Sequence, residues 1–168
     1  SVKNNYEYVK SQMDIKNFIL YNLTNIYIGN NDWPGNNRKF WKGKNGKWRW
    51  ILFDTDFAFG LETGFDYSFN SIKYATNSNC SSPSCRNKPW STVYLRKLLE
   101  NNVFKEQFIN HFADEMNSRF LPDNIKSILQ STHDLISSEI DSHYKRWNRS
   151  SSRAVTYLNS MKEYADKR

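Results

Sequence analysis

Apolar side chains recur every three to four residues over much of the chain, which is the pattern of amphipathic helices. After a polar lead, residues 14–29 show it most clearly; Asp14 is a candidate N-cap, and Gly29 and Asn30 would end a buried helix. Four further helices are predicted: 91–99 with Ser91 as its cap, 102–120 with Asn102 as its cap, one that begins at Pro122 and carries apolar residues as far as Tyr144, and 151–167.

Two short segments between these helices have the character of strands. Residues 38–42 and 47–53 are rich in aromatic and basic side chains and flank the turn-forming residues 43–46, which predicts a β-hairpin. Residues 60–89 are rich in Gly, Ser and Asn, which predicts a long irregular loop. The predicted fold class is therefore mainly α (α+β), a helical bundle with one hairpin near its start, in a single domain over residues 1–168.

The amino-acid composition argues against a disordered chain, a membrane-spanning protein and a nucleic-acid-binding protein. The chain has 168 residues, of which 38% are hydrophobic and 16% aromatic, so we expect a core built from a few large rings rather than a disordered chain. No run of about 18 apolar residues is present that could span a membrane. The net charge of +7 is spread along the chain, and the densest basic run, residues 38–49, alternates across the hairpin, which disfavours nucleic-acid binding.

The two cysteines, Cys80 and Cys85, lie close together in a polar segment that contains a proline. They could form a small disulfide, which suits an oxidising compartment, or remain free thiols. A zinc site is disfavoured because the three histidines lie far away in the sequence. The sequence alone leaves the first two alternatives open.

Three aspartates stand at positions that suit metal chemistry. Asp54 and Asp56 follow directly after the apolar second strand, and Asp32 lies in a turn-rich loop five residues before Asn37. Carboxylate and amide oxygens are the ligands that Mg²⁺ and Mn²⁺ take, together with water and substrate phosphate. The alternative is structural, since Asp and Asn are common turn residues that close backbone hydrogen bonds.

The spacing of these residues favours a more specific interpretation. An Asp, four intervening residues, an Asn and then a hairpin strand that ends in Asp is the order of parts in the catalytic half of a protein kinase. The His-Arg that usually precedes the first Asp is replaced here by Asn30-Asn31. The metal-binding Asp is followed by Thr55-Asp56-Phe57 in place of Phe-Gly, so this is no ordinary eukaryotic-type kinase.

The motif-bearing stretch, residues 13–60, resembles the CotH family, the spore coat protein H-like atypical kinases of bacteria and some eukaryotes. The resemblance rests on two runs, Asn31-Asp32-Trp33-Pro34-Gly35-Asn36-Asn37 and Lys47-Trp48-Arg49-Trp50-Ile51-Leu52-Phe53-Asp54-Thr55-Asp56-Phe57-Ala58-Phe59-Gly60. The preceding residues 13–19 are similar to the helix that leads into the active-site loop of that family.

The resemblance implies roles for single residues. Asp32 would be the catalytic-loop aspartate, as a base or a group that orients the substrate, and Asn37 the metal-binding amide. Asp54 would be the principal ligand of Mg²⁺ or Mn²⁺, with Asp56 as its rival or a second ligand. Arg38, with Lys39 and Lys42, could face the phosphates of ATP or form a solvated face of the hairpin. Trp33, Trp41, Trp48 and Trp50 are expected to pack in the core and the hairpin, and one of them could line the nucleotide or substrate cleft.

The same resemblance implies that the chain is the helical C-terminal lobe of a larger kinase-like domain. A glycine-rich phosphate loop and the lysine-bearing N-terminal lobe are expected outside this chain, so the isolated chain should have weak or no activity. The expected function is phosphoryl transfer from ATP to Ser/Thr of a protein substrate, at the cell surface or spore coat. The alternative is a non-catalytic surface or adhesion module that retains the fold for binding.

Overall fold

The computed structural model describes residues 2–61, 65–80 and 85–168 of the chain. This part is mostly helical and contains one two-stranded antiparallel sheet, which confirms the prediction of a mainly α protein. The elements are α1 (Val2–Gln12), α2 (Ile15–Tyr27), β1 (Lys39–Trp41), β2 (Arg49–Ile51), α3 (Ser71–Ala75), α4 (Val93–Leu99), α5 (Asn102–Met116), α6 (Pro122–Arg146) and α7 (Ser152–Lys167).

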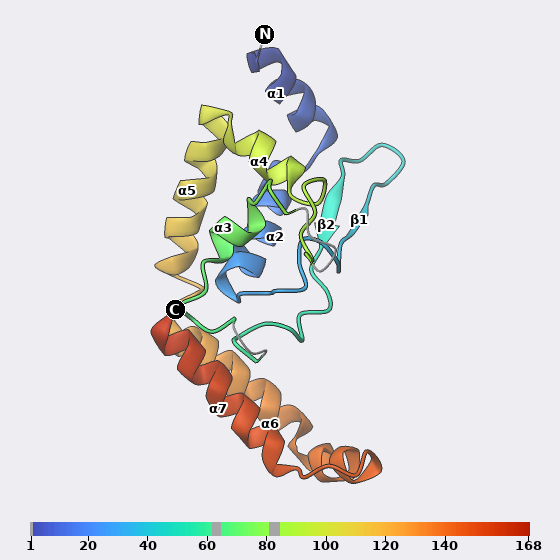
Figure 1. Ribbon diagram of the computed structural model, residues 1–168, viewed down its shortest axis with the longest axis vertical. Helices are drawn as coiled ribbons and strands as arrows, with labels where there is room; N and C mark the ends of the chain where they lie inside the picture. The colour runs from blue at the N-terminus through green and yellow to red at the C-terminus, as the bar shows by residue number, and fades with distance from the viewer. Residues whose placement is uncertain (1, 62–64, 81–84) are drawn as a thin grey trace.

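Helix α2 is the centre of the core and packs against α3, α5 and β2 (Figure 1). Asp14 caps it as predicted, because its Oδ1 accepts a hydrogen bond of 3.0 Å from the Asn17 backbone N–H. Aromatic rings surround it, and the ring centroids of Phe18 and Trp50 lie 4.7 Å apart. Phe104 of α5 is fully buried against the same cluster. The expectation of a core rich in aromatic rings is therefore confirmed for the cluster around α2.

The β-hairpin pairs Lys39 with Ile51 and Trp41 with Arg49, and its turn is closed by a 3.0 Å hydrogen bond from the Gly46 backbone N–H to the Gly43 carbonyl. Its second strand begins against the junction of α1 and α2. There the Trp48 N–H donates to the Gln12 carbonyl at 2.8 Å, and the Asp14 N–H donates to the Trp48 carbonyl at 2.9 Å. The hairpin is thus fixed to the start of α2.

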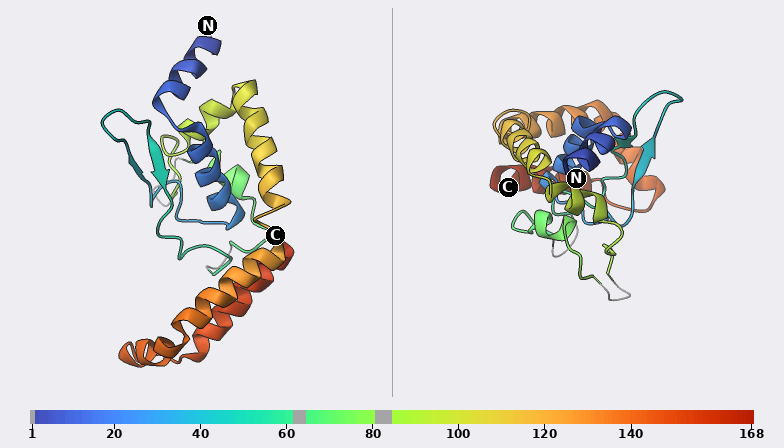
Figure 2. Two further views of the ribbon diagram at one scale, coloured as in Figure 1. Left: turned by 180° about the vertical axis from the view of Figure 1, so that it is seen from behind. Right: turned by 90° about the horizontal axis from the view of Figure 1, so that it is seen from above.

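Helices α6 and α7 lie side by side and project from one end of the molecule (Figures 1 and 2). Arg168, directly after α7, connects these helices to the rest of the molecule. Its guanidinium donates to the carbonyls of Ile26, at 2.9 Å, and Tyr67, at 2.7 Å. The Tyr164 hydroxyl donates to the Tyr27 carbonyl at 3.0 Å. The apolar stripe predicted for α6 is not buried as a whole, since none of its residues is buried and Leu135 is 83% exposed.

Several local predictions were wrong. The polar lead is helix α1, and α3 interrupts the predicted irregular loop. Ser91 does not cap α4, because its hydroxyl donates to the Lys88 carbonyl at 2.7 Å. The cap of α5 is Asn101, one residue before the predicted Asn102, and its Oδ1 accepts from the Phe104 N–H at 3.1 Å. Within the described ranges, no helix combines the length and apolar character needed to cross a membrane.

Candidate active-site loop

The segment that carries Asp32 is anchored to α2 by buried asparagines. Helix α2 ends at Tyr27, and Gly29 turns the chain with a φ of 63°, a value that L side chains rarely adopt. Asn30 is 3% exposed; its Nδ2 donates to Asn25 Oδ1 at 2.9 Å and its Oδ1 accepts from the Asp32 N–H at 3.1 Å. These bonds hold the backbone of Asp32 while its side chain stays partly exposed.

Asn37 joins the two aspartates that the sequence analysis placed at the centre of the site. Its Nδ2 donates to Asp32 Oδ2 at 2.9 Å and to the carbonyl oxygen of Asp54 at 3.3 Å. Asn36 donates to the other carboxylate oxygen of Asp32 at 2.8 Å. Asn37 has a φ of 47°, in the left-handed region that asparagine tolerates better than most residues. The structure therefore brings Asp32, Asn37 and Asp54 together, although Asn37 and Asp54 are 17 positions apart in the sequence.

Asp54 and Asp56 lie just beyond β2, and both are exposed. The pKa of Asp54 is raised above its ordinary value by loss of hydration, by hydrogen bonding to and repulsion from Asp56, and by repulsion from Asp32; Lys39 opposes the shift. Repulsion among neighbouring carboxylates is what a bound cation would relieve. Asp54 has a φ of 52°, so the backbone turns sharply where the strand delivers this carboxylate.

The donor set fits a hard divalent cation in its chemistry. Asp54, Asp56 and Asn37 offer carboxylate and amide oxygens, which Mg²⁺ and Mn²⁺ accept. Across the described residues, however, no three His, Cys, Asp or Glu side chains are grouped closely enough to hold a metal by themselves. A metal held here would therefore need oxygens from Asn37, water or substrate phosphate in addition to the carboxylates, as is usual for Mg²⁺.

The basic side chains after the loop lie on aromatic rings. The Arg38 guanidinium is 4.6 Å from the ring centroid of Trp90, and Lys39 Nζ is 4.2 Å from that of Phe53. Lys42 Nζ donates to Gln12 Oε1 at 3.3 Å. Lys39 is close enough to Asp54 to oppose the rise of its pKa, whereas Lys42 bonds to the last residue of α1.

The tryptophans divide between core and surface. Trp33 is 2% exposed, and Trp50 packs against the core cluster, as expected. Trp41 is 52% exposed and Trp48 is 40% exposed, so the hairpin presents aromatic surface.

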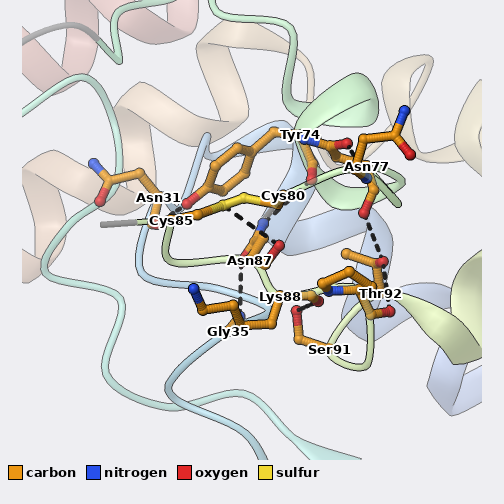
Figure 3. Close-up of a disulfide and its surroundings, with 12 residues drawn as sticks. Asn31, Gly35, Tyr74, Asn77, Cys80, Cys85, Asn87, Lys88, Ser91 and Thr92 are labelled. Atoms are coloured by element: carbon orange, nitrogen blue, oxygen red, sulfur yellow. Dashed lines mark hydrogen bonds between the residues drawn. A yellow bond between two sulfur atoms is a disulfide. The ribbon is translucent and has the colours of Figure 1, made fainter. Parts of the chain in front are cut away.

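A second segment contacts the active-site loop, and the sequence analysis did not find it. Cys80 and Cys85 are joined as a disulfide in the structure, which is the first of the alternatives that the sequence left open (Figure 3). Directly after it, Arg86 donates to Asn31 Oδ1, and Asn87 bonds to Gly35 and Trp33. The cysteine pair is the sequence signal that could have directed attention to these residues, because it marks a closed loop.

The model of one protein family matches residues 1–168, the whole chain, and that family is described as CotH kinase protein. The chain belongs to the CotH kinase protein family. No curated protein and no solved structure matches it. The assignment confirms the resemblance drawn from residues 13–60 and extends it over the helical remainder. In this CotH chain, Asn37 holds the loop of Asp32 against the strand end at Asp54.

Proposed function

We propose that this CotH chain carries the catalytic loop and metal-binding residues of an atypical protein kinase, which transfers phosphate from ATP to Ser or Thr of a protein substrate. The observation that carries the proposal is the contact of Asn37 with both Asp32 and Asp54. In protein kinases a catalytic Asp, a metal-binding Asn and a strand-end Asp form the site together. The family assignment over residues 1–168 supports it.

Each residue has a distinct role in this proposal. Asp32 accepts the proton of the substrate hydroxyl or orients that hydroxyl, and Asn36 and Asn37 fix its carboxylate by hydrogen bonds. Asp54 is the principal residue that would hold Mg²⁺ or Mn²⁺, with Asn37 and Asp56 beside it. The chemistry that such an ion supplies is neutralisation of charge on the nucleotide phosphates. Arg38 and Lys39 are the basic side chains that would attract phosphate.

The decisive experiment uses the full-length protein that contains this chain. Purified wild type is incubated with labelled ATP, Mn²⁺ or Mg²⁺ and a Ser-rich protein substrate, beside Asp32→Asn and Asp54→Asn variants. Asp114→Asn, at an exposed site on α5, is the matched control. We expect the control to keep its activity and each site variant to lose about 100-fold or more, as removal of a general base or a charged ligand does. Equal transfer by all four proteins would contradict the proposal.

The second candidate is a non-catalytic surface or adhesion module that retains the fold for binding. The observation that favours it is the exposed aromatic surface of the hairpin, where Phe40 is 53% and Trp41 52% exposed. It predicts that the full-length protein transfers no phosphate and that partner binding is unaffected by Asp32→Asn but weakened by Trp41→Ala. The disulfide is compatible with the extracytoplasmic, cell-surface or spore-coat location proposed for either function.

A further inference from the structure

Asn87 packs against the active-site loop and bonds to it at Gly35 (Figure 3) and at Trp33. Its side chain is 1% exposed. Its Oδ1 accepts a hydrogen bond of 2.8 Å from the Gly35 backbone N–H, and its Nδ2 donates to the Trp33 carbonyl at 3.4 Å and to the Tyr74 carbonyl at 3.2 Å. One buried amide thus holds the backbone on the C-terminal side of Asp32, where main-chain groups would otherwise lack partners.

The N-terminal side of Asp32 is held by the neighbouring residues. Asn31 is fully buried; its carbonyl accepts from the Tyr74 hydroxyl at 2.6 Å and its Oδ1 accepts from the Arg86 guanidinium. Its backbone N–H donates to the Phe57 carbonyl at 3.1 Å. The backbone of Asp32 is therefore fixed on both sides through bonds to residues 43 to 55 positions later in the chain.

The contact between the two segments is a direct approach of backbone to backbone. A Cβ atom built on Gly35 would lie 2.0 Å from the carbonyl oxygen of Arg86, which is closer than any real side-chain contact. Glycine is therefore required at this place in the loop. Such close packing leaves the loop no room to move toward the 86–87 backbone.

We propose that Asn87 is a positioning residue for the reaction: its amide fixes the loop and so sets the place of the Asp32 carboxylate. The disulfide ends two residues before it, and Cys85 Sγ lies 3.6 Å from the Asn87 carbonyl oxygen. The inference rests on the proposed function of Asp32 as the catalytic aspartate. Asn87 itself touches no reacting atom; it acts through Gly35 and Trp33.

The test compares Asn87→Ala and Asn87→Asp with wild type in the full-length protein. The Asp variant keeps an oxygen for the Gly35 N–H but has no N–H for Trp33 and Tyr74. Asn79→Ala is the matched control, an exposed asparagine of the same segment whose Oδ1 accepts from the Ser78 hydroxyl. Two measurements are made: hydrogen exchange of the Gly35 amide beside that of the Phe108 amide in the buried part of α5, and kcat and KM for ATP.

We expect Asn87→Ala to speed the exchange of Gly35 at least about 10-fold and to leave that of Phe108 unchanged, because only the loop opens. We expect kcat to fall about 10- to 100-fold with little change in KM for ATP, as a displaced catalytic group does. Asn87→Asp should show smaller effects of the same kind, and the control should show none.

Three results would overturn the inference: unchanged exchange of Gly35 in Asn87→Ala, equal acceleration at Gly35 and Phe108, or loss of folding in both variants. The last two would make Asn87 a residue of general stability. If wild type transfers no phosphate, the proposed function is wrong, while the exchange of Gly35 still decides whether Asn87 holds the loop. The two failures are therefore distinguishable.

Discussion

Asn17 and Trp50 are joined by two reciprocal hydrogen bonds: Asn17 Oδ1 accepts from the Trp50 N–H at 2.6 Å, and its Nδ2 donates to the Trp50 carbonyl at 3.2 Å. A side-chain amide on α2 thereby satisfies backbone groups at the edge of β2, where a third strand would otherwise pair. This pair fixes the strand that leads to Asp54 relative to the helix that leads to Asp32.

Asn17→Ala should lower the free energy of unfolding by about 1–3 kcal/mol, because it leaves both backbone groups of Trp50 without these partners. Urea denaturation followed by tryptophan fluorescence measures the change. Asn110→Ala, at an exposed position of α5, is the control and should stay within about 0.5 kcal/mol of wild type. Equal stabilities of the two variants would mean that water replaces the Asn17 amide at no cost.

The stability of the protein should fall between about pH 10 and 12. Burial raises the pKa of Tyr164 to about 12, partly offset by Arg168. In the unfolded chain the Tyr164 hydroxyl loses its proton near the ordinary pKa of 10.0. The contribution of Tyr164 to the free energy of unfolding is therefore complete below pH 10 and is lost as the pH rises through 12. In Tyr164→Phe, denaturant midpoints should fall less steeply over this range. They should not become flat, because the pKa of Tyr21 is also raised to about 12. Parallel curves for the two proteins would contradict the assignment.

The disulfide should contribute about 2 kcal/mol to stability, as expected for a cross-link that closes a short loop. Cys80 and Cys85 are five residues apart and are the only cysteines of the chain, so reduction affects a single bond. The double variant Cys80→Ser/Cys85→Ser should unfold at a lower urea concentration than oxidised wild type and should not respond to dithiothreitol. A double variant that still responds, or an oxidised protein no more stable than a reduced one, would refute this.

The two long helices α6 and α7 offer a matched pair of leucines. Leu158 of α7 is 6% exposed, whereas Leu135 of α6 is 83% exposed. Leu158→Ala should lower the free energy of unfolding by about 2–4 kcal/mol, and Leu135→Ala should change it by less than about 0.5 kcal/mol. A large loss in Leu135→Ala would indicate that this face is covered in solution.

The core of the site could be predicted because it depends on local rules. A turn places Asn37 near Asp32, and the end of an apolar strand places Asp54, so spacing alone was enough to group the three. Helix α2 was predictable for the same reason, since its buried face follows a regular period and Asp14 caps it. The roles of Asp32, Asn37, Asp54, Asp56 and Arg38 toward substrate, metal and phosphate stay predictions.

The contacts of Asn87 could not be predicted in this way. It bonds to Gly35 across 52 residues, and a buried asparagine has no sequence pattern that distinguishes it from the exposed asparagines around it. Helix α1 was missed because few of its side chains face the core. Tyr6 does so and is 5% exposed, whereas the nearby Tyr8 points away and is 69% exposed. The open face of α6 was missed because periodicity predicts an apolar stripe but not what covers it.

The bonds of Arg168 mean that the support of the active-site loop is completed only late in the synthesis of the chain. Its guanidinium binds the carbonyl of Ile26, 142 positions earlier, at the end of the helix from which the loop of Asp32 departs. Contacts of such long sequence separation form late, because loop closure must precede them. During synthesis, the residues of the active-site loop therefore leave the ribosome long before the last bonds that secure their supporting helix can form.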